Sequence, residues 1–119
     1  MRDLVKVFKA LSDETRIRIL KVLLERECCV CEVMQALNIS QSRASRNLGI
    51  LEGVGFIKSR REGPWIVYSV NEQSMRKHTA KLVEVIKGTL EDSEALALDR
   101  ERLKTATRVG SRRIDQERG

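Results

Sequence analysis

The sequence is poor in aromatic residues, which make up 3% of its 119 residues. A hydrophobic core must therefore be built mainly from leucine, valine and isoleucine, and a hydrophobic content of 41% is enough for a modest one. A chain of this length is expected to form one domain. Small domains bury a limited share of their surface, so association of two subunits is expected to supply part of the stability.

The sequence has no apolar run long enough to span a membrane, and its first residues are amphipathic rather than signal-like. We therefore expect a cytoplasmic protein without a membrane partner. Histidine occurs once, as His78, so no Ser/His/Asp catalytic set is available. The strand pattern of a thioredoxin-like sheet is missing too. These absences argue against an enzyme and against a catalytic cofactor.

Cysteine is absent except in one four-residue stretch, which contains Cys28, Cys29 and Cys31. Cytoplasmic thiols are kept reduced, so clustered cysteines there more often bind metals or sense redox state than form structural disulfides. Neighbouring cysteines would also form strained disulfide rings. Free cysteine is often just a small buried apolar residue. Three cysteines within four positions instead favour a binding site for a soft metal or metalloid, or a redox-sensitive thiol site.

Hydrophobic spacing predicts four helices in the first half of the chain. Ser12 is the expected N-cap of the second helix and Ser40 that of the fourth, while Gly55 is the expected C-cap of the fourth. The third and fourth helices are joined by a tight turn and form a helix-turn-helix, whose second helix reads DNA. The expected segments are about 4–11, 13–25, 30–37 and 41–54.

The second half of the chain begins with a predicted hairpin over 56–60 and 65–70, turning at 62–64. Asn71 is then expected to cap a long helix that reaches residue 90. Residues 91–119 are predicted to be a charged C-terminal extension, partly helical at 95–104 and a solvated tail from 108 onward. This order of helices and strands predicts a mainly α winged helix-turn-helix with a two-stranded β-wing. The domain is expected to occupy residues 1–90 and to dimerise through its first and last helices.

Three segments of the sequence resemble the ArsR/SmtB family of metal-responsive repressors, in the order that the family has them. The resemblance covers about residues 4–90 and implies a transcriptional repressor that binds operator DNA as a homodimer. The zinc site that some relatives build from Asp and His on the last helix has no matching ligand set here. The segments read LSDETR at 11–16, ISQSRASRNL at 39–48, and RREG at 60–63 followed by WIVY at 65–68.

Within that family, the stretch ECCVCEV at 27–33 resembles the metalloid-binding box of the arsenic repressors, Glu-Leu-Cys-Val-Cys-Asp-Leu, often followed by a further Cys. Cys29 and Cys31 match its two core ligands. Cys28 occupies a position where the family usually has Leu, and Met34 occupies the position of the further Cys. The third ligand therefore has three candidates: Cys28, an outside thiol, or a cysteine of the partner subunit.

Trivalent arsenic and antimony bind up to three thiolates, and soft sulfur ligands suit them. The N-terminus of a helix and the adjacent Arg26 are expected to favour the thiolate form. If all three cysteines lay on a regular helix, Cys29 and Cys31 would diverge by about 200°, so chelation would have to unwind the first turn. We expect this distortion to weaken DNA binding.

The net charge of +6 favours a polyanionic partner, either nucleic acid or an acidic membrane surface. With the helix-turn-helix, double-stranded operator DNA becomes the expected partner. Two recognition helices of a homodimer would read half-sites ~34 Å apart. The predicted DNA-binding residues are Gln41, Ser42, Arg43, Ser45 and Arg46 on the recognition helix, and Lys58, Arg60 and Arg61 on the wing.

The leading hypothesis is a homodimeric repressor that leaves its operator when arsenite or antimonite binds the cysteine cluster. One alternative is a repressor of the same fold that responds to oxidants, persulfide, cadmium or lead, because the thiol chemistry is shared. Another is a constitutive DNA-binding protein in which the cysteines are incidental.

Overall fold

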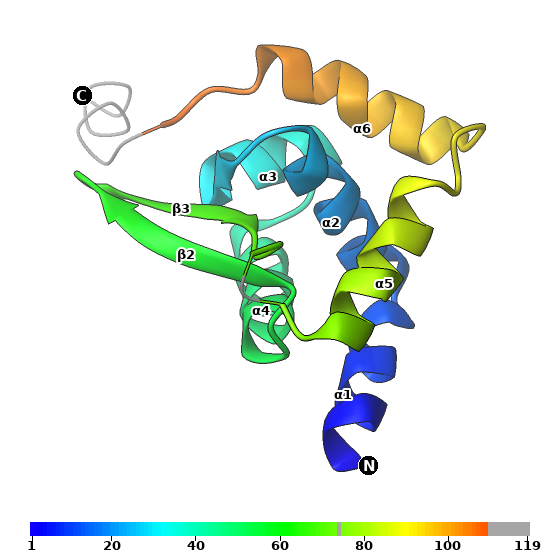
Figure 1. The fold of residues 1–119 in the computed structure, drawn as a ribbon. Helices are drawn as coiled ribbons and strands as arrows, with labels where there is room; N and C mark the ends of the chain where they lie inside the picture. The colour runs from blue at the N-terminus through cyan, green and yellow to red at the C-terminus, as the bar shows by residue number, and fades with distance from the viewer. Residues whose placement is uncertain (74, 110–119) are drawn as a thin grey trace, which may run out of the picture.

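The computed structural model describes residues 1–73 and 75–109, which form six helices around a small antiparallel sheet (Figure 1). Strand β3 is the middle strand, with β1 on one side and β2 on the other. The predicted winged helix-turn-helix is confirmed. The elements are α1 (Arg2–Leu11), α2 (Glu14–Glu25), β1 (Cys28–Cys29), α3 (Val30–Leu37), α4 (Gln41–Gly53), β2 (Ile57–Glu62), β3 (Trp65–Val70), α5 (Lys77–Lys87) and α6 (Glu94–Thr105).

Helices α2, α3 and α4 enclose a core of aliphatic side chains, as the scarcity of aromatic residues predicts. Ile19 of α2 and Leu48 of α4 are fully buried, and so is Phe56, which precedes the wing. Burial of apolar area stabilises by about 25 cal/mol per Å². The three helices are thereby fixed against each other, and the outer face of α4 remains exposed.

The predicted cap at Ser40 is confirmed, whereas those at Gly55 and Ser12 are corrected. The Ser40 side chain accepts a hydrogen bond from the Arg43 amide at 3.2 Å, as an N-cap should. The C-cap of α4 is Val54, and Gly55 follows it with a φ of +88°. Ser12 does not cap α2; its hydroxyl donates to the Lys9 carbonyl oxygen of α1 at 2.8 Å. Asp13 is the N-cap of α2 instead. Its carboxylate also interacts favourably with the positive end of the helix dipole.

The wing differs from the predicted hairpin because a third strand joins it. Cys28 lies opposite Tyr68 and Cys29 opposite Val67, so the short strand β1 completes the free edge of β3. After α2 the chain is extended, and an N-cap residue such as Cys29, with φ −80° and ψ 171°, takes the same backbone region as a strand. The cysteine stretch therefore enters α3 from the sheet.

The predicted long helix up to residue 90 is two helices. Asn71 does not cap it; α5 begins only at Lys77, and the chain turns after α5, with Leu90 at a φ of 65°. Helix α6 then runs back across α2 and α3 (Figure 1). Residues 110–119, which belong to the predicted solvated tail, lie outside the described residues.

A buried carboxylate fixes α6 to the body of the protein. Asp99 is 1% exposed and accepts hydrogen bonds from the guanidinium groups of Arg18 and Arg102, each at 2.8 Å. The same guanidinium groups donate to the carbonyl oxygens of Leu37 and Ala36, at 3.0 and 2.8 Å. The ion pairs thus hold α2, α6 and the end of α3 together.

None of the helices among residues 1–73 and 75–109 is long and apolar enough to cross a lipid bilayer.

We predict that Asp99→Asn destabilises the protein, because it leaves two arginines facing a neutral amide. The free energy of unfolding should fall by roughly 2–3 kcal/mol, since both arginines still reach water. Chemical denaturation followed by circular dichroism measures this change. Glu101→Gln is the matched control, because its ion pair with Lys104 is exposed on the same helix and should contribute less than about 1 kcal/mol. Equal effects of the two substitutions would contradict the prediction.

Candidate functional site

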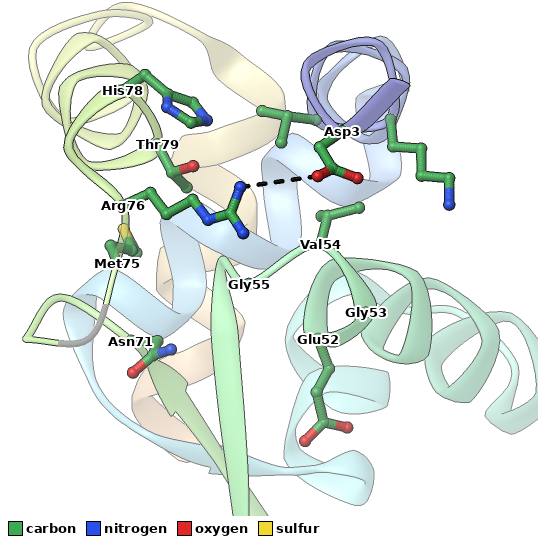
Figure 2. A pocket seen from close by; sticks show the side chains of 12 residues that line it. Asp3, Glu52, Gly53, Val54, Gly55, Asn71, Met75, Arg76, His78 and Thr79 are labelled. Carbon is green, nitrogen blue, oxygen red and sulfur yellow. Dashed lines mark ion pairs between the residues drawn. The ribbon is translucent and has the colours of Figure 1, made fainter. Parts of the chain in front are cut away.

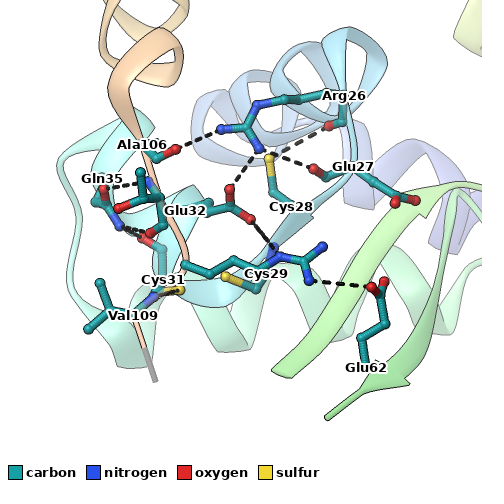
Figure 3. A network of polar contacts seen from close by, with 12 residues as sticks. Arg26, Glu27, Cys28, Cys29, Cys31, Glu32, Gln35, Glu62, Ala106 and Val109 are labelled. Carbon is teal, nitrogen blue, oxygen red and sulfur yellow. Dashed lines mark hydrogen bonds and ion pairs between the residues drawn. The ribbon is translucent and has the colours of Figure 1, made fainter. Parts of the chain in front are cut away.

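The three cysteines lie where β1 passes into α3 (Figure 3). Cys28 is fully buried, belongs to the hydrophobic core, and has its sulfur 3.6 Å from the carbonyl oxygen of Arg26. Cys29 is buried and Cys31 half-buried, and both line the same groove. The cluster therefore consists of a pair of thiols, Cys29 and Cys31, and a third thiol turned into the core.

This arrangement corrects the prediction that the cysteines share the first turn of a helix. Successive side chains of a strand point to opposite faces, so Cys28 and Cys29 diverge. The passage from strand to helix then brings Cys29 and Cys31 together without unwinding α3. Within residues 1–73 and 75–109, no three His, Cys, Asp or Glu side chains are arranged as a ready metal-binding group. The predicted three-thiol set is thus not preassembled.

A buried glutamate holds the backbone at this junction. The Glu32 carboxylate accepts from the Cys29 amide at 3.0 Å and from the Arg26 guanidinium at 2.7 Å. With the Cys29 sulfur facing the Glu32 amide, this is a capping box at the start of α3. Burial pushes the pKa of Glu32 upward, but the hydrogen bonds from Arg26 and Cys29 outweigh it and leave that pKa lowered. Glu32 is therefore a fixed anion beside the thiols.

The prediction that this position favours thiolates is wrong for two of the three cysteines. Burial raises the pKa of Cys28 to about 12, against the lowering effect of the Arg26 charge. Burial, together with the hydrogen bond to Cys31, also raises the pKa of Cys29 to about 12. The charge of Arg26, which is paired with Glu32, lowers the pKa of Cys28 but does not offset its burial. At neutral pH both thiols are protonated.

The residues after α6 return to the cysteines as a C-terminal strap, residues 106–109. The Val109 amide donates to the Cys31 sulfur at 3.2 Å, and Thr107 exchanges two hydrogen bonds with Gln35 of α3 (Figure 3). The Arg108 guanidinium lies 3.8 Å from the Glu32 carboxylate. The strap was missed by the sequence analysis, because the charged segment that contains it has no clear periodicity.

The tip of the wing is tied to the same strap. Arg108 is 3.4 Å from the Glu62 carboxylate and 5.6 Å from the centre of the Trp65 ring, over which its charge lies. One arginine thus connects the strap with the cap of α3 and the end of the hairpin.

A groove of about 670 Å³ opens beside the paired thiols, and we call it the thiol groove. Its floor comes from α3, one wall from the wing tip, and its far edge from the start of α4. Its lining residues include Cys29, Cys31, Met34, Ile39, Gln41, Pro64, Trp65, Ile66 and Val109.

A second hollow, of about 360 Å³, lies between α1, the end of α4 and the start of α5 (Figure 2). Asp3 and Arg76 form an ion pair at 3.7 Å across it, and His78 lies at its rim. None of the predicted site residues lines this hollow.

The five predicted DNA-binding residues of α4 are all exposed. Arg43 also donates to the Thr15 hydroxyl at 2.8 Å, which ties α4 to α2. Asn47, buried behind them, accepts from Arg16 at 2.9 Å and donates to the Arg43 carbonyl oxygen. Arg16 and Asn47 therefore set the orientation of α4, a role that the residue pattern alone did not reveal.

The basic residues of the wing are not equivalent. Lys58 and Arg61 are exposed, whereas both terminal nitrogens of Arg60 donate to the Glu27 carboxylate, at 2.7 and 2.6 Å. Arg60 also pairs with Glu62. Glu27 directly precedes the cysteines, so Arg60 connects the wing to the thiol site. The predicted DNA contacts of all these residues remain predictions.

Fold and site together define a winged-helix regulator of transcription with a thiol cluster at its helix-turn-helix. The sequence model of the family described as "Bacterial regulatory protein, arsR family" matches residues 13–59. An uncharacterised HTH-type transcriptional regulator from Methanocaldococcus jannaschii is 39% identical over 80 residues, which are 66% of this chain and 89% of that protein. The chain belongs to the arsR family of bacterial regulatory proteins, a family of transcriptional regulators and not of enzymes.

Other relatives are named for resistance to different metals. A cadmium resistance regulatory protein homolog from Staphylococcus aureus is 45% identical over 83 residues, 69% of this chain and 65% of that protein. An arsenic resistance regulator from Pseudomonas putida is 47% identical over 68 residues, 56% of this chain and 59% of that protein. The chain thus spans less than two thirds of the length of these two relatives.

Among solved structures, the homodimeric winged helix-turn-helix DNA-binding domain of a possible ArsR-family regulator from Mycobacterium bovis is similar to this chain. The TM-score is 0.62 at 28% identity, over 72% of this chain and 76% of that one.

We predict that alkylation separates the three thiols. The thiolate is the reactive form, so at pH 8 iodoacetamide should modify half-buried Cys31 first, and Cys28 and Cys29 at least about a hundredfold more slowly. Their rates should rise about tenfold per pH unit, since both pKa values lie near 12. Peptide mass spectrometry measures the rates, and guanidinium chloride provides the control in which all three react alike. Equal rates in the native protein at pH 8 would contradict the assigned burial.

The same raised pKa values give the folded state a pH dependence. A thiol whose pKa is higher in the folded than in the unfolded chain stabilises the fold below pH 9, the ordinary value, and this contribution is lost as the pH approaches 12. Cys28→Ala should therefore flatten the alkaline limb of the stability curve relative to wild type.

Proposed function

We propose that this protein is a homodimeric repressor that releases operator DNA when trivalent arsenic or antimony binds through Cys29 and Cys31. The observation that carries the proposal is that these two cysteines line one groove, the thiol groove, while Cys28 is buried in the core. The pair lies at the point where the sheet enters the helix-turn-helix. A ligand that joins the two sulfurs therefore acts on the part of the fold that positions α4.

The protonated state of the Cys29 thiol suits arsenous acid. Each As–OH group exchanges with one thiol, an As–S bond replaces the As–O bond, and the thiol proton leaves with the hydroxide as water. Arsenic remains trivalent and no net proton is released. A cadmium ion must instead displace protons, and it does so against the raised pKa of Cys29. The buried neutral thiol of Cys29 therefore favours the metalloid.

The identity of the third ligand decides whether the site has to rearrange. To join the other two thiols, Cys28 has to leave the core and its contact with the Arg26 carbonyl oxygen. This movement would pull on β1, which is paired with β3 of the wing. An outside thiol or a cysteine of the partner subunit would complete the arsenic pyramid without it. The three candidates from the sequence thus remain, with different structural consequences.

Three connections can carry ligand binding to the DNA-binding surface. Cys29 belongs to the sheet and Cys31 to α3, so drawing their sulfurs together shifts the wing against the helix-turn-helix. The bidentate pair of Glu27 and Arg60 joins the cysteine stretch to the wing a second time. The Val109 amide must give up the Cys31 sulfur that the ligand takes. Coupling free energies of about 1–3 kcal/mol are typical of such linkage.

The proposed DNA contacts are the exposed residues of α4 and the basic residues of the wing. Gln41, Ser42 and Arg43 lie at the start of α4, where base edges are usually read, with Ser45 and Arg46 next to them. Lys58, Arg60 and Arg61 would hold the DNA backbone or minor groove. Two copies would read half-sites about one helical turn apart.

The proposed dimer surface is formed by α1 and α5. Leu4, Val5 and Phe8 of α1 are 43–53% exposed, and Val85 of α5 is 59% exposed. Apolar side chains gathered in this way mark an interaction surface. The homodimeric domain from Mycobacterium bovis has the same fold, which supports two-fold assembly here.

We predict that arsenite releases DNA from the wild type and leaves Cys29→Ser and Cys31→Ser bound. A fluorescent duplex selected by the apo-protein from a random pool serves as operator, and fluorescence anisotropy measures its affinity. The affinity should fall about 5–150-fold at saturation. Ser42→Ala is the control for a weakened DNA contact, since it should lower affinity without removing the arsenite response. An operator affinity indifferent to arsenite would refute the proposal.

The pH dependence distinguishes arsenic from cadmium as the inducer. Between about pH 6.5 and 8, the Kd for arsenite should stay within about twofold because no net proton is released. The Kd for Cd²⁺ should fall about tenfold per pH unit for each thiol proton that it displaces. Isothermal titration of both ligands in two buffers of different ionisation enthalpy measures the proton count. Tight binding of cadmium alone would assign the protein to the cadmium alternative, which the relative from Staphylococcus aureus supports.

A further inference from the structure

We propose that Arg108 of the C-terminal strap is a positioning residue for operator binding, because it holds the tip of the wing in the orientation in which the wing meets DNA. The proposal rests on the proposed function and concerns the affinity for operator DNA in the absence of an inducer. It gives a role in DNA binding to a residue that follows α6, far in sequence from the helix-turn-helix and the wing.

The wing needs support at its tip because the hairpin extends past the third strand of the sheet. Strand β1 pairs with Tyr68 and Val67 of β3, so Trp65 lies beyond that pairing. The last pair of the hairpin is Glu62 of β2 with Trp65 of β3. A two-stranded ribbon is marginally stable by itself. The tip therefore needs a contact with the body of the protein to keep one orientation.

Arg108 supplies this contact by holding both residues of the last pair. Its guanidinium lies 3.4 Å from the Glu62 carboxylate and 5.6 Å from the centre of the Trp65 ring, above the ring face. The Nε1 atom of Trp65 is buried, so the edge of the ring that carries it is turned away from solvent. The chain after α6 runs toward the tip of the hairpin (Figure 1). One side chain of the strap thus joins both strands of the wing.

The strap is in turn fixed to α3. The Arg108 guanidinium is 3.8 Å from the buried carboxylate of Glu32, which caps α3. Next to it, Thr107 exchanges two hydrogen bonds with the Gln35 side chain of α3, at 2.7 and 3.1 Å (Figure 3). Since α3 is the first helix of the helix-turn-helix, Arg108 connects the wing tip with the part of the fold that carries α4.

This connection matters for DNA binding because the basic residues of the wing all lie on β2. The distance of Lys58, Arg60 and Arg61 from α4 depends on the angle between the hairpin and the helix-turn-helix. A binding surface that is already held in its bound geometry loses less conformational entropy when the partner arrives. The operator should therefore bind more tightly while Arg108 holds the tip.

An arginine beside the wing could instead bind a DNA phosphate directly. Arg108 is 32% exposed, and its guanidinium already faces the carboxylates of Glu32 and Glu62 and the ring of Trp65. A phosphate would have to displace these partners, and the wing tip would then lose its support. The geometry accordingly favours positioning over direct contact, and the two roles differ in a measurable way.

The experiment measures the Kd for the selected operator duplex by fluorescence anisotropy, with the full chain and no inducer. Arg108→Gln should raise the Kd about fivefold, because the wing tip must then be ordered on binding. Arg108→Lys keeps a charge beside both carboxylates and should restore the Kd to within about twofold of wild type. Lys104→Gln is the matched control. It removes the same charge from an exposed ion pair on α6 and should change the Kd less than about twofold.

Two further readouts separate positioning from direct contact and from a general loss of structure. Each lost phosphate contact lowers the slope of log Kd against log salt by about 0.9, whereas a positioning residue leaves the slope unchanged. Trp65 is the one tryptophan of the sequence, so its fluorescence reports on the wing tip. Acrylamide should quench it more in free Arg108→Gln than in free wild type, and operator DNA should remove the difference.

Two other variants test the same connection from its two ends. Gln35→Ala releases Thr107 without any change of charge, and it should raise the Kd about twofold and expose Trp65 to acrylamide. This variant decides the question if Arg108→Gln loses helix by circular dichroism. In a Glu62→Gln background, Arg108→Gln should raise the Kd less than about twofold, because the contact is already weakened.

The outcomes separate this inference from the proposed function. Selection that yields no duplex bound by the wild type would refute the proposed function. A wild-type Kd for Arg108→Gln, or for Gln35→Ala with Trp65 exposed, would overturn the inference alone. A salt slope lowered by about 0.9 in Arg108→Gln would also overturn it, since Arg108 would then bind phosphate itself. Equal losses in Arg108→Gln and Lys104→Gln, or in Arg108→Gln and Arg108→Lys, would count against it in the same way.

Discussion

The buried carboxylate of Glu32 is the interaction on which the rest of the site depends. It accepts hydrogen bonds from the Cys29 amide and the Arg26 guanidinium, and it forms an ion pair with Arg108 of the C-terminal strap. A buried anion is stable only while such partners surround it. The cost of losing any partner therefore keeps each partner in its position. The end of β1, the start of α3 and the strap therefore share one anchor. Displacement of any one of them disturbs the other two.

The fold could be predicted largely from the sequence because its signals are local. Apolar spacing and the Ser40 cap define the helix-turn-helix, and the strand-like stretches define the wing. The features that escaped prediction depend on pairing with distant residues. Cys28 and Cys29 become a strand because β3 has a free edge beside them, and α6 docks because Asp99 meets Arg18 from the other end of the chain.

The sequence was sufficient to identify the residues of the candidate site, but it was not sufficient to predict their arrangement in space. The spacing of the cysteines identified the thiols, but the assumption of a regular helix made Cys29 and Cys31 diverge and led us to expect thiolates. Both errors have one cause, since burial in the sheet decides which sulfurs meet and which protonation state they hold. Arg60 shows the same limit. Its charge and place in the wing suggested a DNA contact alone, while the fold also joins it to Glu27.

Strand β1 pairs only two residues with its neighbour, Cys28 with Tyr68 and Cys29 with Val67. So short a ladder adds few backbone hydrogen bonds, and burial of the Cys28 side chain in the core is what holds β1 in place. In the proposed repressor, release of this strand would therefore be governed by how readily one side chain leaves the core, and the helices need not refold when it returns.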